Sequence, residues 1–569
     1  MASDDMHGVV PDMGHEDKVA ILNSIIFTSC LLVLLAIGYR IHTGRLTKLP
    51  KSGAAMIIGF VVGCVVRIFG LREEEQILDF NGEFFFYVLL PPIIFEAGLS
   101  LETRVFVDNL GAILAYAVVG SLVSTWVVSN GLLVAAKTGL VGLVDGQRLG
   151  VSCYLFGALI SATDPVATIA LFGGSRFRTD PLLVSLINGE SVLNDAVAIV
   201  LFSALEQHLD DQAPSLLSFS VLGHFVLVSV GSLIFGLVAG GTCSWCFCQA
   251  EFLKGYPDYE IGSMCLSAYL TFAFSQFCGL SGIVSLFFFG VVLTHYNWYN
   301  LSEPSKVASK VTFRTLAMLA EACVFVYLGV VVALSIWRFH WHFSLAVVAM
   351  VLCIFARAAN IFPLSAMLNA QRSRKIPQNM QVMMWLSGLR GAIAFALSLR
   401  IPCQAAPRAN RGHHECQNSD LLVTTTITIV FVSTMILGTA MENIATALHI
   451  IEPEVRQFNE GLSAPLSQES APSCDGWRPE LEEPVGQSYR GCKLSLDELR
   501  VNTRGHLYQA FARFDLDVLQ NLIGGPCRAR VTVPDAVELP SLHSFIDQQS
   551  VPRHFTADED ATQYSVVFE

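Results

Sequence analysis

Apolar residues in this sequence are gathered into blocks of about twenty residues, and this grouping limits the fold more than any other feature. Of the 569 residues, 53% are hydrophobic and only 15% are charged. About twenty apolar residues in a helix are enough to cross the hydrocarbon core of a bilayer. The sequence therefore predicts an all-α polytopic membrane protein.

The apolar blocks predict roughly thirteen membrane-spanning helices. The seventh block is too long for one perpendicular crossing, so it tilts, extends into the cytosol, or contains a break near Gly240 and Gly241. It separates six blocks from six, an arrangement typical of transporters built from inverted six-helix repeats. The blocks lie near residues 19–39, 52–70, 83–101, 109–136, 151–172, 181–207, 216–250, 261–278, 280–296, 311–337, 342–369, 379–401 and 420–448.

Lysine and arginine in the connecting loops predict the orientation of the chain. Such residues collect on the cytosolic side of membrane proteins, and here almost all fall on one side, with Arg408 and Arg411 as exceptions. The N-terminus is therefore expected outside the cell or in a lumen. The basic residues that define the cytosolic side are Arg40, Arg45, Lys48, Lys51, Arg176, Arg178, Lys306, Lys310, Arg372, Arg374 and Lys375.

Three regions follow from this topology. Residues 1–18 form a short extracellular or lumenal N-terminus, residues 19–451 the transmembrane domain, and residues 452–569 a cytosolic regulatory tail that is partly disordered by composition. Within the tail, apolar residues recur at helical spacing from Leu494 to Leu522. This segment is expected to dock on the membrane domain or on a regulatory protein, or to form a surface helix.

The charge and the cysteines restrict the remaining properties only weakly. A net charge of −13 argues against nucleic acid as a partner. Cys403 and Cys416 share one predicted outside loop, where the compartment permits a disulfide, and the sequence leaves that pairing open. No targeting signal is evident, so the plasma membrane and endosomal or Golgi membranes all remain open.

The most informative polar residues are Asn194 and Asp195, which interrupt the apolar stretch 188–202. An ionisable residue within a membrane span is costly and marks a functional site by default. Glu190 lies four residues before Asn194 and shares its helix face, whereas Asp195 is turned by about 100°. One helix can thus present one carboxylate to a cavity and another to a neighbouring helix.

Two other spans contain sequences that favour a break in the helix. Thr163, Asp164 and Pro165 follow one another, and a proline inside a helix removes a backbone hydrogen bond and frees carbonyl groups. In the twelfth block, glycines flank Arg390. An arginine in a membrane needs an anion or carbonyl groups, and Glu190 is the natural candidate.

Further charged residues lie in other spans. Glu321 is accompanied by Arg314 on the same span and by Arg357 in the next one, and these residues either belong to a pathway or form scaffold ion pairs, with scaffold favoured. Glu96 follows two consecutive prolines, which predict a further break near the start of a pathway.

At these residues the sequence closely resembles the eukaryotic sodium/proton exchangers of the monovalent cation:proton antiporter family. The pattern is closest to the organellar and isoform-eight branch, and the resemblance extends from about the second span to Ile451. It rests on the order and spacing of six segments: FFFYVLLPPIIFEAGLSLE from Phe84, SATDPVATIALF from Ser161, NGESVLNDAVAIVLF from Asn188, EACVFVYLG from Glu321, FARAANIFPLS from Phe355 and WLSGLRGAIAFALSLR from Trp385.

The resemblance implies a homodimer of thirteen-helix protomers, each with a dimerisation domain and a six-helix core containing two crossed, broken helices. Those broken helices would be the spans that carry Asp164 and residues 388–391. Asp195 resembles the carboxylate that binds the ion and the proton, with Asn194 as its neighbour. Asp164 and Thr163 resemble the lining of the crossing, and Glu190 and Arg390 resemble a stabilising ion pair.

The function so implied is electroneutral exchange of Na+, or of K+, for H+ by alternating access, which would regulate pH and cation content. The transported cation would bind at Asp195, and neither a cofactor nor an enzymatic activity is expected. Asn188 and Thr163 depart from residues common in relatives, which leaves the choice between Na+ and K+ open. The alternatives are a K+-preferring organellar exchanger, a cation channel, for which no filter motif is evident, and a sensor that acts through the tail.

Overall fold

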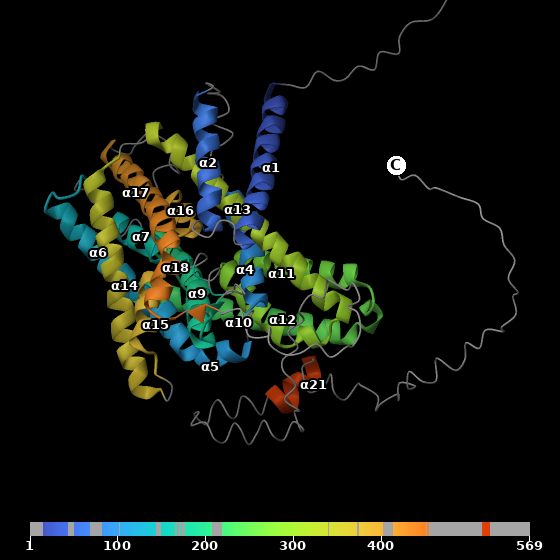
Figure 1. Ribbon diagram of the computed structural model, residues 1–569. Helices are drawn as coiled ribbons and strands as arrows, with labels where there is room; N and C mark the ends of the chain where they lie inside the picture. The colour runs from blue at the N-terminus through green and yellow to red at the C-terminus, as the bar shows by residue number, and fades with distance from the viewer. Residues whose placement is uncertain are drawn as a thin grey trace, which may run out of the picture.

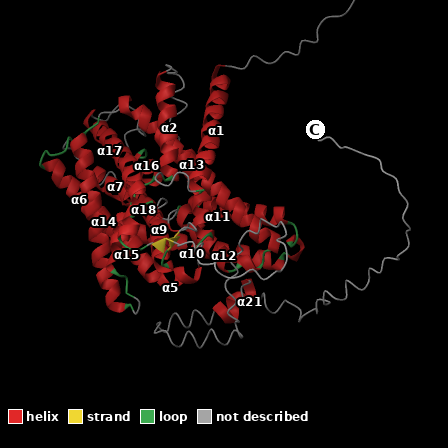
Figure 2. Cartoon of the chain, viewed as in Figure 1, coloured by secondary structure: helices red, strands yellow, loops and turns green. Residues whose placement is uncertain are grey.

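The computed structural model describes residues 15–43, 50–68, 82–101, 103–143, 149–164, 168, 172, 177–207, 219–338, 341–372, 375–401, 413–450, 452–453 and 515–523. These residues are almost entirely helical (Figure 2). Two strands of two residues each, β1 (Phe177–Arg178) and β2 (Glu452–Pro453), pair antiparallel.

The first half of the chain contains α1 (His15–His42), α2 (Lys51–Ile68), α3 (Gly82–Phe84), the π-helix η1 (Phe85–Leu89), α4 (Leu90–Leu99), α5 (Thr103–Leu114), the π-helix η2 (Ala115–Val119), α6 (Gly120–Lys137), α7 (Leu149–Ser161), α9 (Pro181–Glu206), α10 (Phe219–Gln249), the 3-10 helix η3 (Glu251–Leu253), α11 (Pro257–Phe277) and α12 (Gly282–His295).

The second half contains the 3-10 helix η4 (Asn297–Tyr299), α13 (Glu303–Arg338), α14 (Phe343–Gln371), α15 (Gln378–Leu386), α16 (Ala392–Ser398), α17 (His413–Val432), the π-helix η5 (Ser433–Leu437), α18 (Gly438–Ala447), the π-helix η6 (Asp515–Leu519) and α21 (Gln520–Ile523).

The helices confirm the expected class of an all-α polytopic membrane protein. Within the described residues, nine helical segments are long and apolar enough to cross a membrane, and α7 and α12 are shorter apolar helices. Each of the predicted blocks contains at least one described helix. The number thirteen itself stays a prediction, because several of these helices are short or broken.

The helices pack in two neighbouring groups (Figure 1). In one group α2 lies along α13, while α4, α10 and α11 pack on α12. In the other group α6 and α9 pack on α7, and α14 packs on α6. The contact of α2 with α13 is unusually close because Gly59 faces Gly329, and a Cβ on either residue would overlap the backbone of the partner helix.

Helix α9 lies deepest among the long helices. Most of its residues are buried, whereas α1 and α10 expose much of their apolar surface. A helix that is apolar nearly all round and buried belongs to the interior of a bundle. The start of α9 is fixed by Pro181 in its first turn and by the Asp180 side chain, which accepts a hydrogen bond of 2.9 Å from the Leu182 amide.

Two of the breaks considered from the sequence are absent. Helix α10 runs without interruption through Gly240 and Gly241, so its length of 31 residues accounts for the long seventh block. Gly240 instead allows close packing on α12, since a Cβ there would lie 2.8 Å from Val292 Cβ. Pro91 and Pro92 lie inside a continuous helix from Gly82 to Leu99, where they lack amide donors, and the π-helix η1 directly before them accommodates the missing hydrogen bonds.

The tail contacts the membrane domain at two places in the described part of the chain. Strand β2 pairs with β1, which lies in the connection between α7 and α9. Further on, α21 lies against the end of α10, below α12 in Figure 1, and Asp515 of η6 contacts the end of α12. The predicted tail helix is described only from Asp515 to Ile523. The pairing of Cys403 with Cys416, which the sequence leaves open, involves side chains outside the described part of the chain.

Candidate functional site

The site is built where two interrupted helices meet. Helix α7 ends at Ser161 and the chain continues without helical structure through Asp164, while α15 ends at Leu386 and α16 begins only at Ala392. The amide of Asp164 donates a hydrogen bond of 2.8 Å to the carbonyl oxygen of Leu389. Both breaks predicted from the sequence therefore occur, and they touch each other.

Gly391 allows this close contact. A Cβ on Gly391 would overlap the side chain of Asp164. The backbone of Gly391 has φ −115°, which any residue can adopt. Space, and not backbone conformation, is therefore the reason for a glycine here.

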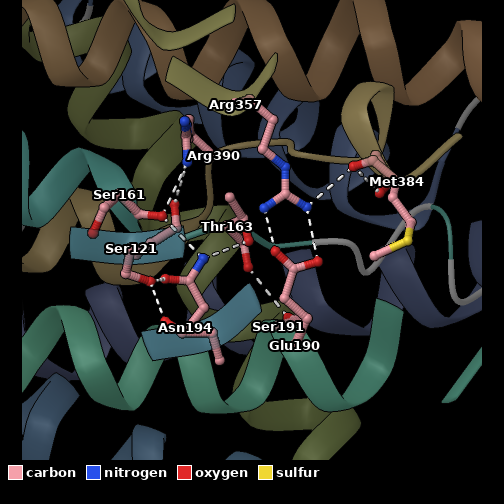
Figure 3. A network of polar contacts seen from close by, with 12 residues as sticks. Ser121, Ser161, Thr163, Glu190, Ser191, Asn194, Arg357, Met384 and Arg390 are labelled. Atoms are coloured by element: carbon pink, nitrogen blue, oxygen red, sulfur yellow. Dashed lines mark hydrogen bonds and ion pairs between the residues drawn. The ribbon is translucent and has the colours of Figure 1, made fainter. Parts of the chain in front are cut away.

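Asn194 ties α9 to the break after α7 (Figure 3). Its amide nitrogen donates to the carbonyl oxygen of Ser161 at 3.0 Å and to Oγ1 of Thr163 at 2.8 Å. Its oxygen accepts a short hydrogen bond from Ser121 on α6. One helix turn earlier, the Ser191 hydroxyl donates to the carbonyl oxygen of Thr163 at 3.2 Å. Asn194 is buried and its amide is fully engaged, so it serves to hold the site in shape.

Arg390 lies on the other side of the same break. Its guanidinium donates to the carbonyl oxygens of Ser161 and Ala162, at 3.2 and 3.1 Å. Carbonyl groups at the end of a helix lack helical partners and carry partial negative charge, so a cation there is favourable. The Arg390 amide in turn donates to the hydroxyl of Ser433 in η5 at 3.3 Å.

Glu190 forms its ion pair with Arg357. The sequence predicted Arg390 as its partner, and that prediction is wrong. Both nitrogens of the Arg357 guanidinium contact the Glu190 carboxylate, Nη1 closely and Nη2 at 3.0 Å, and Nη2 also donates to the carbonyl oxygen of Met384 at 3.1 Å. The side chains are only 6% and 2% exposed. Arg390 is bound to the helix-end carbonyl groups, so α14 supplies the partner instead (Figure 3).

Asp195 differs from its polar neighbours. It is partly buried, and in the described part of the chain it makes neither a hydrogen bond nor an ion pair. Asp164 and Arg390 lie within electrostatic reach of its carboxylate. An ionisable group at this depth without a dedicated partner is free to take up a cation or a proton.

Two further acids approach this site from the other group of helices. Glu321 on α13 is within electrostatic reach of Asp164, of Lys51 and of Glu96. Glu96 on α4 is in turn within reach of Arg314. The structure thus brings Glu321 near the crossing, and its role in a pathway or a scaffold stays a prediction. Arg357, which the sequence grouped with Glu321, pairs instead with Glu190 on α9.

Sequence reasoning missed two serines of the site. Ser121 holds the Asn194 oxygen, and Ser433 accepts from the Arg390 amide. A signal for Ser121 was present, because Ser121, Ser124 and Thr125 form a buried polar stripe in an apolar span. Ser433 carries no comparable signal, since its contact depends on where η5 packs.

Two broken helices that touch, next to a carboxylate without an ion pair among the described residues, are typical of ion transporters. Comparison with known proteins identifies the group within this class. The model of the sodium/hydrogen exchanger transmembrane family matches residues 31–447, and the chain belongs to that family.

Relatives extend over most of this chain. Sodium/hydrogen exchanger 8 of Mus musculus is 38% identical over 419 residues, covering 72% of this chain and 68% of the relative. The protein of the same name from Homo sapiens is 36% identical over 441 residues, covering 76% and 71%. Sodium/hydrogen exchanger 1 of Arabidopsis thaliana is 31% identical over 450 residues, covering 76% and 80%. The family resemblance drawn from the sequence segments is thereby confirmed.

A solved structure shows the same fold. The sodium proton antiporter MjNhaP1 from Methanocaldococcus jannaschii superposes with a TM-score of 0.59 at 17% identity, covering 76% of this chain and 99% of that one. The chain is accordingly an integral membrane protein with the antiporter fold.

Proposed function

We propose that this protein exchanges Na+ for H+ across a membrane, one for one, by alternating access, with Asp195 as the group that binds either ion. The observation that carries the proposal is the contrast between Asp195 and Asn194. The amide is held on both sides, whereas the adjacent carboxylate has no hydrogen-bonding or ion-pair partner in the described part of the chain. The names of the relatives support Na+ as the cation.

Electroneutral exchange follows from the neutral neighbour. Because Asn194 cannot titrate, the Asn194–Asp195 pair holds one charge at most. When Asp195 carries either Na+ or a proton, the pair crosses the membrane neutralised in both directions. A charged site would cross the bilayer only at a much higher cost. One Na+ would therefore move for each H+, without net current.

The surrounding residues would keep this site in place. Thr163 uses Oγ1 and its carbonyl oxygen as acceptors for α9, and each oxygen keeps a second lone pair that can face a cation. Asp164 lines the crossing together with Thr163. Arg390 neutralises the carbonyl groups at the end of α7, and the Glu190–Arg357 pair joins α9 to α14. None of these three charged groups needs to titrate during transport.

The proposal includes two assembly properties. We expect a homodimer in the membrane, and a regulatory protein that contacts the cytosolic tail. The exposed aromatic and aliphatic residues of α11, among them Tyr259, Tyr269 and Phe277, form a surface that fits a second copy or lipid. Subunit counting by single-molecule photobleaching in native membranes would test the dimer.

The decisive experiment is transport by purified protein in liposomes. An acid-inside pH gradient is imposed, the voltage is clamped, and Na+, K+ or Li+ is added outside while the internal pH is followed. The wild type should alkalinise the lumen on addition of Na+ without net current, and Asp195→Asn should abolish this response while eluting normally from size exclusion. Asp258→Asn, the same chemical change at an exposed residue of α11, should transport like the wild type.

The outcomes separate the candidate functions. Alkalinisation driven equally or better by K+ would replace Na+ by K+ as the cargo and leave the site unchanged. A cation current without proton movement would indicate a channel. Normal exchange by Asp195→Asn would refute the assignment of the site.

A further inference from the structure

A short segment of the tail, Asp515–Ile523, is seated on the cytosolic ends of α10 and α12. Four residues of the membrane domain contact this segment, and together they are called the docking corner below: Ser244, His295, Tyr296 and Asn300. The Asn300 amide donates to the carbonyl oxygen of Ile523 at 2.9 Å, and the Ser244 hydroxyl donates to the same oxygen at 3.2 Å. The corner is thus complementary to the end of the segment.

The start of the segment is held by its charge. One oxygen of the buried Asp515 carboxylate accepts a hydrogen bond from the Tyr296 hydroxyl. The other oxygen lies 3.7 Å from Nε2 of His295 and accepts a hydrogen bond of 2.8 Å from the side-chain amide of Gln520. Burying a carboxylate is costly unless such donors compensate it. Docking of the segment therefore depends on the docking corner as well as on apolar contact.

The contact between the segment and the docking corner is small enough for docking to be reversible. Val518 and Leu522 remain 44% and 55% exposed, so these two side chains bury little apolar surface. About sixty residues separate it from β2, where the tail first contacts the membrane domain. Because the segment belongs to the same chain, its docking is intramolecular and has a higher effective concentration than binding of a free peptide. Weak docking is then enough for substantial occupancy, and small changes in affinity alter it.

The charged and titratable groups that face Asp515 are few. From the end of α12 they are His295 and Tyr296, and from its own helix the neutral Gln520. On α10, the hydroxyl of Ser244 is engaged with the carbonyl oxygen of Ile523, and on α11 Glu260 accepts a hydrogen bond of 3.1 Å from the Ser302 amide. Within the described residues, the imidazole is the only group facing Asp515 whose side chain ordinarily changes charge near neutral pH.

We propose that the docking corner is a protonation-dependent receptor for residues 515–523 of the tail, and that the segment binds more tightly when His295 is charged. The tail thereby senses cytosolic acidification: it docks as the cytosol becomes acidic and releases as it becomes alkaline. This inference concerns the tail and does not depend on which ions the membrane domain carries.

The pKa of Asp515 makes the sign of the effect clear. Burial acts to raise this pKa, but the nearby imidazole of His295 and the hydrogen bonds from Tyr296 and Gln520 outweigh burial and hold it below its usual value. An acid with a lowered pKa stabilises docking at all pH values above its ordinary range of about 4, and loses that contribution only as the pH falls below this range. Burial and the bond to Asp515 raise the pKa of Tyr296, so its hydroxyl stays a donor. Neither Asp515 nor Tyr296 therefore changes its protonation between pH 6 and 8.

The test is hydrogen–deuterium exchange of the full-length protein in lipid nanodiscs at pH 6 and pH 8, corrected for the intrinsic rate at each pH. Amides of 515–523 should be about two- to fivefold more protected at pH 6. His295→Gln should remove the pH difference and keep residual protection, and Asp515→Asn should remove the pH difference and lower the protection. Asp535→Asn, which removes the same charge elsewhere in the tail, should behave like the wild type.

Two results would overturn the proposal. Equal protection of the segment in the wild type and in Asp515→Asn would show that the carboxylate does not hold it. Protection that increases from pH 6 to pH 8 would contradict the role of His295. Neither readout requires transport, so a failure of the exchange assay would leave this test intact.

Discussion

At the scale of single residues, the charged side chains at the centre of the protein differ in the groups that they contact. Arg390 meets carbonyl groups, Arg357 meets Glu190, and Asp195 is left without an ion-pair partner in the described part of the chain. A buried ion pair does not stabilise a protein strongly as a whole, but removal of one member leaves an uncompensated charge. The pair is therefore best tested by removing its members singly and together.

Arg357→Met should lower the free energy of unfolding by about 3–5 kcal/mol, because Glu190 would remain buried and unpaired. The double variant Glu190→Gln/Arg357→Met should recover a large part of this loss. Thermal unfolding in detergent, followed by the fluorescence of a thiol-reactive dye, provides the measurement.

The control for this cycle is Lys306→Met. Lys306 pairs with Glu303, whose side chain is 86% exposed, so the loss should stay below about 1 kcal/mol. If Glu190→Gln rescued Arg390→Met instead of Arg357→Met, the pairing predicted from the sequence would be right and the pairing in the structure wrong.

The sequence could predict which residues matter here, but not all of their partners. Asp195, Glu190 and Arg390 are conspicuous because charges are rare in apolar spans. The choice between Arg390 and Arg357 depends on which helices lie next to α9 and on which carbonyl groups lose their helical partners. Both depend on tertiary packing, which the sequence of a single span does not predict.

At the scale of elements, the site depends on two interruptions that touch. Pro165 and the glycines around Arg390 are local signals, so each interruption could be predicted separately. Their contact, the hydrogen bond from Asp164 to Leu389, joins residues more than two hundred positions apart in sequence and depends on how α7 and α15 cross. The uninterrupted α10 shows the opposite case, in which glycines serve packing and not a break.

Gly391→Ala should impair exchange because the new methyl group would overlap the side chain of Asp164. Overpacking of this kind costs about 1–3 kcal/mol, and we expect the rate of exchange to fall by about tenfold because the site is displaced. Gly262→Ala is the matched control, since a Cβ at that position on α11 has no atom within 4 Å. Equal rates for the two variants in the liposome assay would contradict the importance of the close crossing.

At the scale of the whole molecule, the tail contacts both groups of helices. Strand β2 pairs with the connection between α7 and α9, whereas η6 and α21 sit on α10 and the end of α12. Helical spacing from Leu494 to Leu522 predicted docking as one of several alternatives. The polar contact through Asp515 carries no apolar signal, so the sequence did not indicate it.

The predicted orientation can be tested through Cys278. This exposed thiol follows the last residue of α11, at the end that the distribution of Lys and Arg places outside. A membrane-impermeant maleimide applied to sealed right-side-out vesicles should label it, and mass spectrometry of peptides would identify the position. Cys246 is exposed near the C-terminal end of α10, which the same distribution places in the cytosol, and it should react only after permeabilisation. The reverse pattern would invert the topology.

The ion pair between Glu190 and Arg357 also has a consequence for biosynthesis. The two residues are separated by 167 positions, and ribosomes add roughly 5–20 residues each second. Glu190 therefore enters the membrane roughly ten to thirty seconds before its partner has been made. During that interval Glu190 has no arginine partner, so its carboxyl group has to stay hydrated or take up a proton. The ion pair that joins α9 to α14 can form only after α14 has been translated.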